Sequence, residues 1–312
     1  MIKIGVVNID VSHPLMFSTV LNQGSRARYV AVYNEGFRGD DEVNGFVRKQ
    51  GLDKICHSVE ELADYVDVGF VQNCNWDKHL KYAMAFIERG KPVFIDKPMV
   101  GNVADCRKLI ELERKGAIIL GSSSVRYCNE VRQYLSLPEE KKGKVLHIDI
   151  TVGVDEFNYA VHAVEAMCAL AGTRPVSVRY VGTAHREGQS CETFFVEFEG
   201  GVTACYHCVA GNYVSFNVIV LTTVDSHCFT IDNDALYKAL LDQICNRLEG
   251  KPHCLAGIED LTDSIKVLLA GKCSRESAGA MVGIDSPALE TVRFDGDAFE
   301  KEYAANARPM YL

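Results

Sequence analysis

The chain has 312 residues, of which 47% are hydrophobic and 24% are charged, and its mean hydropathy is −0.02. These proportions are typical of a globular protein and exclude a disordered or fibrous chain. The 33 basic and 42 acidic residues leave a formal net charge of −9, so we expect no nucleic-acid partner. A chain of this length can bury a sizeable core, and two domains are the natural expectation.

The sequence shows no targeting or membrane segment. Residues 1–8 lack the basic flank, long apolar run and small-residue cleavage site of a signal peptide. No stretch approaches the roughly 20 apolar residues that a spanning helix needs, so we expect no membrane partner. The twelve cysteines are scattered through predicted strands and helices rather than spaced as a disulfide framework. They favour reduced thiols and a cytoplasmic protein.

The first 120 residues alternate short apolar runs with helical patterns. The predicted strands are 3–7, 30–33, 68–71, 93–95 and 117–120. Ser58 and Glu61 have the spacing of a capping box, and Asn102 can cap a further helix that stops at Gly116. Buried strands separated by helices indicate a parallel sheet covered on both faces. We therefore predict an α/β protein whose residues 1–120 form a Rossmann-like, doubly wound nucleotide-binding domain.

The pattern changes near residue 144, where strand-like runs follow one another with short connections. The predicted strands are 145–152, 176–181, 193–198, 202–208, 215–221 and 228–231, and the predicted helices are 158–170, 235–248 and 258–270. Glu-Gly-Gly at 199–201 is typical of a hairpin. We predict that residues 121–312 form an α+β domain with a mostly antiparallel open sheet, which binds substrate and mediates oligomerisation. Alternating apolar residues at 193–221 suggest a partly covered face, so we expect a homodimer or homotetramer.

The loop after the first strand is where a dinucleotide fold needs glycines, so that the backbone can approach the pyrophosphate. Asn8, Asp10 and His13 stand at the three glycine positions. One interpretation is a loop that still holds a ligand at a helix N-terminus, and the other is a plain turn capped by Asp10 or Ser12. Asn34, at the end of the second strand, stands where an acid would bond a ribose hydroxyl, or is a solvated turn residue.

Asp96, Lys97 and Pro98 follow a buried strand, which would direct the lysine toward the ligand crevice. Nearby charge or burial could tune the pKa of Lys97 toward proton transfer, and a cis Pro98 would fix a sharp turn. A surface Asp–Lys pair before a turn proline is the alternative on spacing alone.

Residues 90–99, Gly-Lys-Pro-Val-Phe-Ile-Asp-Lys-Pro-Met, resemble the signature of the glucose-fructose oxidoreductase / inositol dehydrogenase (Gfo/Idh/MocA) family, whose motif is usually Glu-Lys-Pro. The loop at 73–75 with its downstream His79 is similar to another family segment, as is 124–127. The span 154–165 resembles the family helix with the pattern Asp-x-x-x-His-x-x-Asp. In this chain its three positions read Asn158, His162 and Glu165, which would share one helix face.

This resemblance implies an NAD(P)-dependent oxidoreductase of sugars, polyols or related carbohydrates. It makes Lys97 and His162 the catalytic residues that handle the proton, and a histidine that titrates near neutrality suits that role. The residues that would shape the substrate site are Asn158, Tyr159, Glu165 and Arg126. The residues that would line the cofactor site are Asn8, Asp10, Ser12, His13, Asn34, Asn73, Cys74, His79, Asp96 and Pro98.

The missing glycines leave NAD, NADP and the absence of either cofactor open. The alternative function is a sugar-modifying lyase, hydrolase or isomerase on the same fold, with a divergent or absent nicotinamide site and with or without a metal. A third is a non-catalytic sugar-binding sensor or partner subunit. Trp76 and Tyr159 can stack on a sugar ring, or simply pack.

Two residue patterns raise the question of a metal. His162 and Glu165, with the acids at 155–156, could hold a divalent ion, but polar residues that face a substrate are the preferred interpretation. Cys205 and Cys208 have a Cys-x-x-Cys spacing. In a strand these two cysteines point to opposite faces, which argues against metal or redox use. We assign no metal ligand from the sequence.

Overall fold

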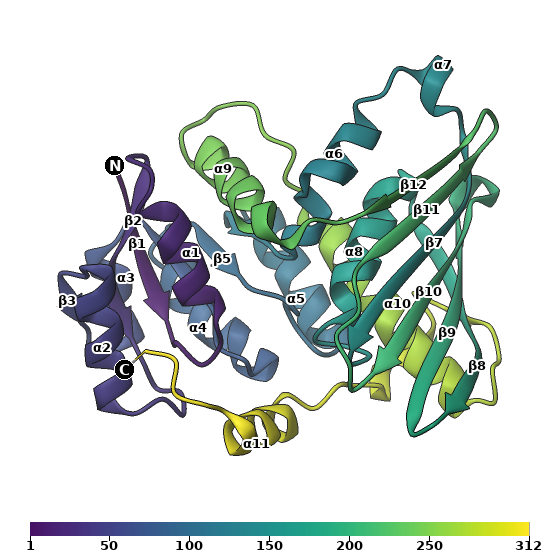
Figure 1. Ribbon diagram of the computed structural model, residues 1–312. Coiled ribbons are helices and arrows are strands. Elements are labelled where there is room, and N and C mark those ends of the chain that lie inside the picture. The colour runs from purple at the N-terminus through teal and green to yellow at the C-terminus, as the bar shows by residue number, and fades with distance from the viewer. Residues whose placement is uncertain (312) are drawn as a thin grey trace.

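The computed structural model describes residues 1–311 and contains two sheets (Figure 1). One is a six-stranded parallel sheet in the N-terminal half, and the other is a seven-stranded, mostly antiparallel sheet in the C-terminal half. The predicted fold class is confirmed. The sequence-based division at residue 120 coincides with the end of the last parallel strand, and as a division into domains it stays a proposal.

The parallel sheet has the strand order of a dinucleotide-binding fold. In spatial order its strands are β3 (Lys54–Ile55), β2 (Ala27–Tyr33), β1 (Ile2–Val7), β4 (Val68–Val71), β5 (Val93–Ile95) and β6 (Ile119–Leu120). The chain order reverses between β1 and β4, and ligands bind such sheets at this switch point, outside the carboxyl ends of the strands. Neighbouring residues of one strand, such as Val6 and Val7, enter different hydrophobic clusters, so both faces are covered.

Among the helices of this half, those that begin after Ser58 and Asn102 lie where the sequence predicts them. The helices are α1 (His13–Leu21), α2 (Asp40–Gln50), α3 (Val59–Tyr65), α4 (His79–Ile87) and α5 (Val103–Arg114). Ser58 Oγ accepts the Glu61 backbone N–H at 3.1 Å, and Asn102 caps α5 in the same manner. Gly116 has a φ of 97°, which a glycine adopts without strain after the helix.

The second sheet is covered on one face. In spatial order its strands are β12 (Ser226–Thr230), β11 (Asn217–Thr222), β7 (Val145–Val154), β10 (Thr203–Ala210), β9 (Gln189–Phe198), β8 (Pro175–Arg186) and β13 (Val282–Gly283). The β7–β10 pair is parallel and the other neighbours are antiparallel. Helices α8 (Ala160–Ala171) and α10 (Ile258–Glu276) pack against one face (Figure 1). Helices α6 (Asn129–Leu135), α7 (Glu139–Lys142) and α9 (Leu236–Leu248) complete this half.

Some elements differ from their predicted bounds. Helix α8 begins at Ala160 rather than at 158, because Asp155 Oδ1 accepts the backbone N–H groups of Phe157 and Tyr159 and holds a turn before the helix. Strands β3 and β13 have two residues each, too few to leave an apolar pattern. Helix α2 and a last helix, α11 (Gly296–Asn306), were not predicted.

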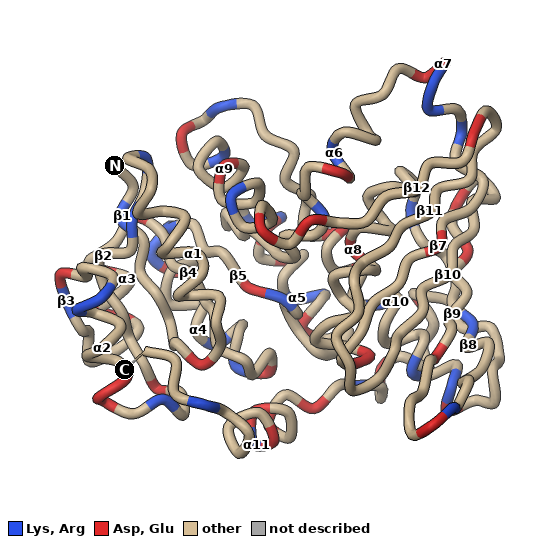
Figure 2. The backbone as a smooth tube through the Cα atoms, in the orientation of Figure 1, with Lys and Arg blue, Asp and Glu red and all other residues tan. Residues whose placement is uncertain are grey.

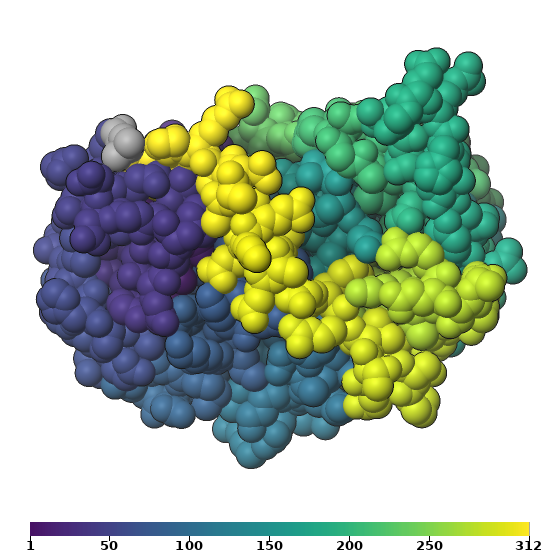
Figure 3. Space-filling model, turned by 90° about the horizontal axis from the view of Figure 1, so that it is seen from below, coloured from purple at the N-terminus to yellow at the C-terminus, as the bar shows by residue number. Residues whose placement is uncertain are grey.

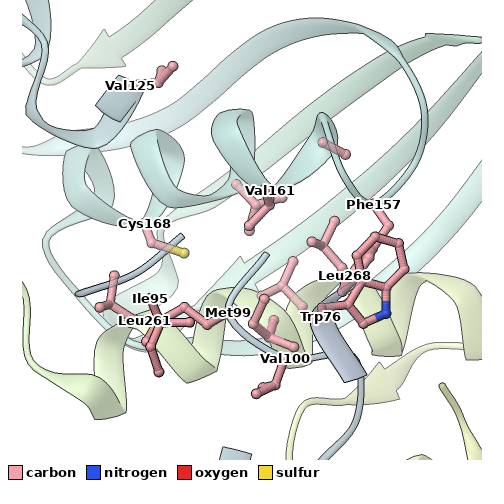
Figure 4. Close-up of a cluster of buried hydrophobic side chains, with 14 of the residues drawn as sticks. Trp76, Ile95, Met99, Val100, Val125, Phe157, Val161, Cys168, Leu261 and Leu268 are labelled. Carbon is pink, nitrogen blue, oxygen red and sulfur yellow. The ribbon is translucent and has the colours of Figure 1, made fainter. Parts of the chain in front are cut away.

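A hydrophobic cluster joins the two halves, and Trp76 lies within it (Figure 4). The Trp76 ring is 3% exposed and makes an edge contact with Phe157 at a centroid distance of 4.9 Å. Its Nε1 donates to the carbonyl of Phe294 at 2.8 Å. Trp76 is therefore a core residue and offers no platform for a sugar ring.

The C-terminal segment, which we define as residues 296–311, returns to the N-terminal half. It comprises α11 and the chain that follows it (Figure 1). Seen from below, this segment runs across the boundary between the two halves (Figure 3). It therefore lies against the edge of the parallel sheet where a ligand crevice is expected.

Charges of both signs are interspersed over the backbone of both halves (Figure 2). Within residues 1–311, no helix combines the length and apolar character that crossing a bilayer requires.

Candidate functional site

A cavity of about 240 Å³ lies where the two halves meet. Its lining residues are Ser12, His13, Lys97, Ser124, Val125, Tyr159, His162, Tyr213, Phe216, Asn233, Leu236 and Tyr237. The loop after β1 and the end of β5 contribute from one half, and α8 and the start of α9 contribute from the other. The structure thus brings Lys97 and His162, which the sequence singles out, to one cavity.

The ammonium group of Lys97 is held at the cavity by the residues that precede α8. Its Nζ donates to Asn158 Oδ1 at 2.8 Å and to the Asn158 carbonyl at 3.2 Å, and lies 5.4 Å from the centroid of the Tyr159 ring. Burial lowers the pKa of Lys97 from its ordinary 10.5, although the nearby Asp96 carboxylate opposes the change. A lysine with a lowered pKa is a better proton acceptor near neutral pH.

A contact between His13 and the buried carboxylate of Asp96 lies next to Lys97. His13 Nδ1 is 2.7 Å from Asp96 Oδ2, and the backbone N–H of Lys97 donates to Asp96 Oδ1 at 2.8 Å. Burial acts to raise the pKa of Asp96, but His13 and Lys97 outweigh it and the pKa is lowered overall. The peptide between Lys97 and Pro98 is cis. Asp96 is therefore an anion that fixes both His13 and the Lys97 backbone.

The imidazole of His162 is held by Ser123. Its Nδ1 lies 2.6 Å from Ser123 Oγ, which also accepts the backbone N–H of Val125 at 3.2 Å. In the arrangement in which the Ser123 hydroxyl donates to Nδ1, the ring hydrogen lies on Nε2. Burial, together with Lys97 and His13, lowers the pKa of His162 well below 6.5. His162 is therefore a neutral imidazole with an N–H donor.

Arg126 and Glu165, expected at the substrate site, do not line this cavity. The Glu165 carboxylate accepts Ser122 Oγ at 2.7 Å and the Ser123 backbone N–H at 3.2 Å, and burial raises its pKa. Arg126 donates to the Glu165 carbonyl at 3.1 Å and lines a different cavity. Helix α8 begins at Ala160, so Asn158 lies in the turn before it, and the substrate role of Arg126 and Glu165 stays a prediction.

The metal cluster considered around His162 does not assemble in residues 1–311. Asp155 is occupied as the cap before α8. Glu156 forms an ion pair with Arg275 at 2.5 Å. Each acid therefore has a structural partner of its own.

The loop after β1 is tied to the loop after β2 by side-chain amides. Asn8 has a φ of 63°, and its Oδ1 accepts the Glu35 backbone N–H at 2.7 Å. Asn34 Oδ1 accepts the backbone N–H of Ile9 at 3.2 Å, and its Nδ2 donates to the carbonyl of Arg38 at 3.0 Å. Both residues lie near the expected dinucleotide crevice, but they bond the protein's own backbone.

Asp10, in the loop after β1, packs against the loops after β2 and β4. Its side chain is fully buried, and Oδ2 accepts the backbone N–H of Cys74 from the loop after β4 at 3.3 Å. A Cβ placed on Gly36, in the loop after β2, would lie 1.8 Å from Asp10 Oδ1. Burial raises the pKa of Asp10 to about 6. Its Oδ1 is buried without a hydrogen-bond partner among the described residues.

The loop after β4 is equally enclosed. The His79 ring bridges the carbonyls of Asn73 and Met99, at 2.9 and 3.0 Å, and burial lowers its pKa. Asn73 Nδ2 donates to the Asn75 carbonyl at 2.6 Å, and burial raises the pKa of the Cys74 thiol. These residues shape the loop from within.

The C-terminal segment covers these loops from outside (Figure 3). Asn75 Nδ2 donates to Glu300 Oε2 at 2.8 Å, and the buried Arg38 donates to the Arg308 carbonyl at 2.8 Å. The hydroxyl of Tyr311, which is 1% exposed, donates to the carbonyl of Val11. The segment thus bonds the loops after β1, β2 and β4.

The residues present fit only one end of a dinucleotide in this arrangement. The nicotinamide end has the open cavity beside Lys97. At the adenosine end, Asp10 and the C-terminal segment fill the space between the loops. The cavity is also below the roughly 300–1,000 Å³ typical of sites for drug-sized ligands. A dinucleotide that reached across the loops after β1, β2 and β4 would meet Asp10 and the C-terminal segment in these positions.

Several residues that line the cavity have no sequence motif to identify them. Tyr213 and Phe216 precede β11, and Asn233, Leu236 and Tyr237 lie at the start of α9. The Tyr237 ring lies 5.4 Å from that of His13, and burial raises its pKa to about 12. An aromatic residue on a helix facing a core gives the same pattern, so composition alone does not reveal them.

Comparisons with known proteins agree with this architecture. Residues 3–122 match the model of the Gfo/Idh/MocA family, described as an oxidoreductase family with an NAD-binding Rossmann fold. A 60-residue stretch is 38% identical to inositol 2-dehydrogenase from Gluconacetobacter diazotrophicus, covering 19% of this chain and 18% of that enzyme. The match thus spans less than a fifth of that relative's length.

Solved structures share the fold over nearly the whole chain. Scyllo-inositol dehydrogenase from Lactobacillus casei, crystallised with NAD(H) and scyllo-inositol, superposes with a TM-score of 0.76 at 14% identity, covering 92% of this chain and all of that one. UDP-N-acetylglucosamine 3-dehydrogenase from Acidithiobacillus ferrooxidans gives 0.71 at 12% identity, covering 88% of this chain and 97% of that one. The family match is thus confined to residues 3–122, and the solved structures, at 12–14% identity, extend the likeness in fold to both halves of the chain.

Proposed function

We propose that this protein is an NAD(P)-dependent oxidoreductase that interconverts a hydroxyl and a carbonyl on a sugar, polyol or related carbohydrate. The observation that carries the proposal is the shared cavity of Lys97 and His162. Its position at the carboxyl end of β5 is where a parallel sheet of this order binds ligands. A cavity of about 240 Å³ suits a compact polar substrate.

Lys97 and His162 both interact with the reacting oxygen of the substrate, but in different roles. Lys97, with its lowered pKa, accepts the hydroxyl proton at Nζ during oxidation and returns it during reduction. His162 donates a hydrogen bond from Nε2 to the same oxygen and so positions it. Asn158 holds Nζ through two acceptors, and Tyr159 forms one wall. When bound, a nicotinamide supplies the hydride acceptor.

Of the expected cofactor residues, Ser12 and His13 line the cavity itself, and Asp96 and Pro98 lie directly behind it. They would flank the nicotinamide end. The groups around Asp10 would meet the adenosine end only after the loops separate. NAD and NADP are not distinguished by these contacts.

The test is a binding and turnover experiment with purified protein. NADH and NADPH are titrated separately by calorimetry, and a panel of polyols and sugars is then assayed for nicotinamide reduction. We expect micromolar binding of at least one nucleotide and turnover of at least one polyol. Binding no tighter than millimolar for both nucleotides, with no turnover, would overturn the proposal.

The filled adenosine end favours a second candidate, a lyase, hydrolase or isomerase of modified sugars that uses the same cavity. Lys97 would then move a proton without hydride transfer. One measurement distinguishes the two candidates, namely the activity that remains after exhaustive removal of nicotinamide nucleotides. Activity that persists supports the second candidate and contradicts the first.

The expected homodimer or homotetramer and the cytoplasmic location stay predictions. The outer face of the second sheet exposes Ile219 and Leu221, each 39% accessible, so size-exclusion chromatography with light scattering is the direct check.

A further inference from the structure

Metal-binding side chains gather on the outer face of the second sheet, opposite the face that α8 covers. Strands β7 and β10 are parallel neighbours (Figure 1), and their register pairs Cys205 with Asp149. His147 and His207 lie two residues away on the same face, while the residues between them, such as Ile148, are buried inward. The topology thus brings two imidazoles, a carboxylate and a thiol together.

Three of these side chains have the spacing of a ligand set. The ligand atoms of His147, Asp149 and Cys205 all lie within 4.8 Å of one another. His147 Nε2 is 3.4 Å from Asp149 Oδ2. Zinc bonds of 2.0–2.3 Å in a tetrahedron place ligand atoms roughly 3.3–3.8 Å apart. Small rotations of these partly exposed side chains would reach that geometry.

Thr203 forms a hydrogen bond with the Nδ1 atom of His147. His147 Nδ1 lies 2.7 Å from Thr203 Oγ1, whose own hydrogen points to the Leu146 carbonyl at 3.5 Å. In the tautomer that donates its Nδ1 hydrogen to Thr203, the Nε2 lone pair faces an oxygen of Asp149 and can bind a cation. Two acceptors that face each other in this way are stabilised by a cation between them. Hydrogen bonding at the other ring nitrogen is the usual support for a metal-binding histidine.

His207 positions the carboxylate from the other side. Its Nε2 is 3.2 Å from Asp149 Oδ1, and its Nδ1 is 3.0 Å from Thr193 Oγ1. The two oxygens of Asp149 are thus directed toward different imidazoles, Oδ2 toward the ligand set and Oδ1 toward His207.

We propose that His147, Asp149 and Cys205 bind a divalent cation of the zinc class, with His207 as the positioning residue for Asp149. Nitrogen, oxygen and sulfur donors together match the borderline-soft character of Zn²⁺, and a water would complete four-fold coordination. As the sulfur–zinc bond forms, the Cys205 thiol gives its proton to solvent. The Cys-x-x-Cys spacing draws attention to Cys208, whereas the proposed partners of Cys205, His147 and Asp149, lie on the neighbouring strand β7. This site does not depend on the proposed oxidoreductase function.

The test is metal titration of the full-length protein, reduced with a phosphine, stripped with a chelator and exchanged into metal-free buffer. Zn²⁺ is titrated by calorimetry, and Co²⁺ is added separately to report a thiolate-to-cobalt charge-transfer band. We expect one Zn²⁺ per chain, the charge-transfer band, and a raised melting temperature with zinc. Cys205→Ser should abolish the band, and His147→Ala should weaken zinc binding by about 10–100-fold or more.

Cys228→Ser is the matched control, because Cys228 is an exposed thiol in β12 of the same sheet. It should leave the stoichiometry and the band unchanged. His207→Asn should weaken zinc binding less than His147→Ala does, which distinguishes positioning from ligation. A stoichiometry well below one, or a band that survives Cys205→Ser, would overturn the proposal. Circular dichroism of each stripped variant excludes unfolding as the cause.

Discussion

The carboxyl edge of the parallel sheet has two regions that use polar residues in opposite ways. Beside β5, Lys97 and His13 face a cavity that also receives His162 from the other half. Beside β1, β2 and β4, Asp10 and Asn34 bond the protein's own backbone. The same edge thus lines an open cavity with polar groups at one end and buries polar groups between packed loops at the other, and only groups that reach an open cavity can contact a ligand.

The largest expected effect is at Lys97. Lys97→Ala should lower kcat/KM by about 10²–10⁴-fold, because it removes the group proposed to move the proton. Lys97→Arg should lose nearly as much, since a guanidinium stays protonated at working pH. Steady-state kinetics on the best polyol measure both. Lys108→Ala, at a half-buried lysine on α5 outside the cavity lining, is the control, and full activity in Lys97→Arg would remove the proton-transfer role.

The second largest expected effect is on stability, and it comes from the titration of Asp10. Its pKa is about 6 in the folded protein against an ordinary 3.8, so the folded state binds more protons than the unfolded chain between these values. Stability is therefore lost as pH rises from about 4 to about 6, by up to roughly 3 kcal/mol. Asp10→Asn cannot titrate. As the pH rises from about 4 to about 6, the wild type should therefore lose up to roughly 3 kcal/mol of unfolding free energy relative to Asp10→Asn.

Urea denaturation at pH 4 and pH 7.5 measures this difference. Asp40→Asn, at an exposed position at the start of α2, is the control and should run parallel to the wild type. A constant gap between Asp10→Asn and wild type across this range would show that the carboxyl does not carry the effect.

The fold was readable from sequence because its signals are local. Capping side chains such as Ser58 and Asn102 mark helix starts, and buried strands form continuous apolar runs. The meeting of Lys97 and His162 was also predictable, since each follows or begins an element whose place in the fold is set by that pattern. Local spacing and the family resemblance pointed to the same two residues.

The rest depends on tertiary contacts that leave no local pattern. The resemblance and the helix face predict Glu165 at the substrate, and no local pattern shows that its carboxylate accepts the Ser122 hydroxyl and the Ser123 backbone N–H. Asp10 was expected to face a cofactor, yet the loops of β2 and β4 pack directly on it. Tyr237 reaches the cavity only because α9 packs beside α1, a contact between segments far apart in sequence.

Ser123 offers a smaller effect that sharpens the assignment of His162. Ser123→Ala removes the hydroxyl that fixes the ring tautomer, and a hydrogen bond of about 1 kcal/mol corresponds to roughly five- to tenfold in kcat/KM. The pH profile should change as well, since the ring hydrogen is no longer confined to Nε2. Ser122→Ala is the matched control because Ser122 bonds Glu165 rather than His162. Equal effects of the two variants would assign Ser123 a purely structural role.

The smallest effect concerns the C-terminal segment and separates the two regions of the sheet edge most directly. Tyr311→Phe keeps the ring against Phe46 and removes the hydroxyl that donates to the Val11 carbonyl. Losing that bond should cost about 0.5–1.5 kcal/mol of the segment's docking free energy. If a dinucleotide must displace the segment, its affinity rises by the same free energy, at most about tenfold, while polyol binding at Lys97 is unchanged. Tyr303→Phe, on α11, is the control because it leaves the Val11 contact intact. NADH titration of the two variants decides the matter, because a destabilised Tyr311→Phe protein with wild-type NADH affinity would mean that the segment lies outside the path of the cofactor.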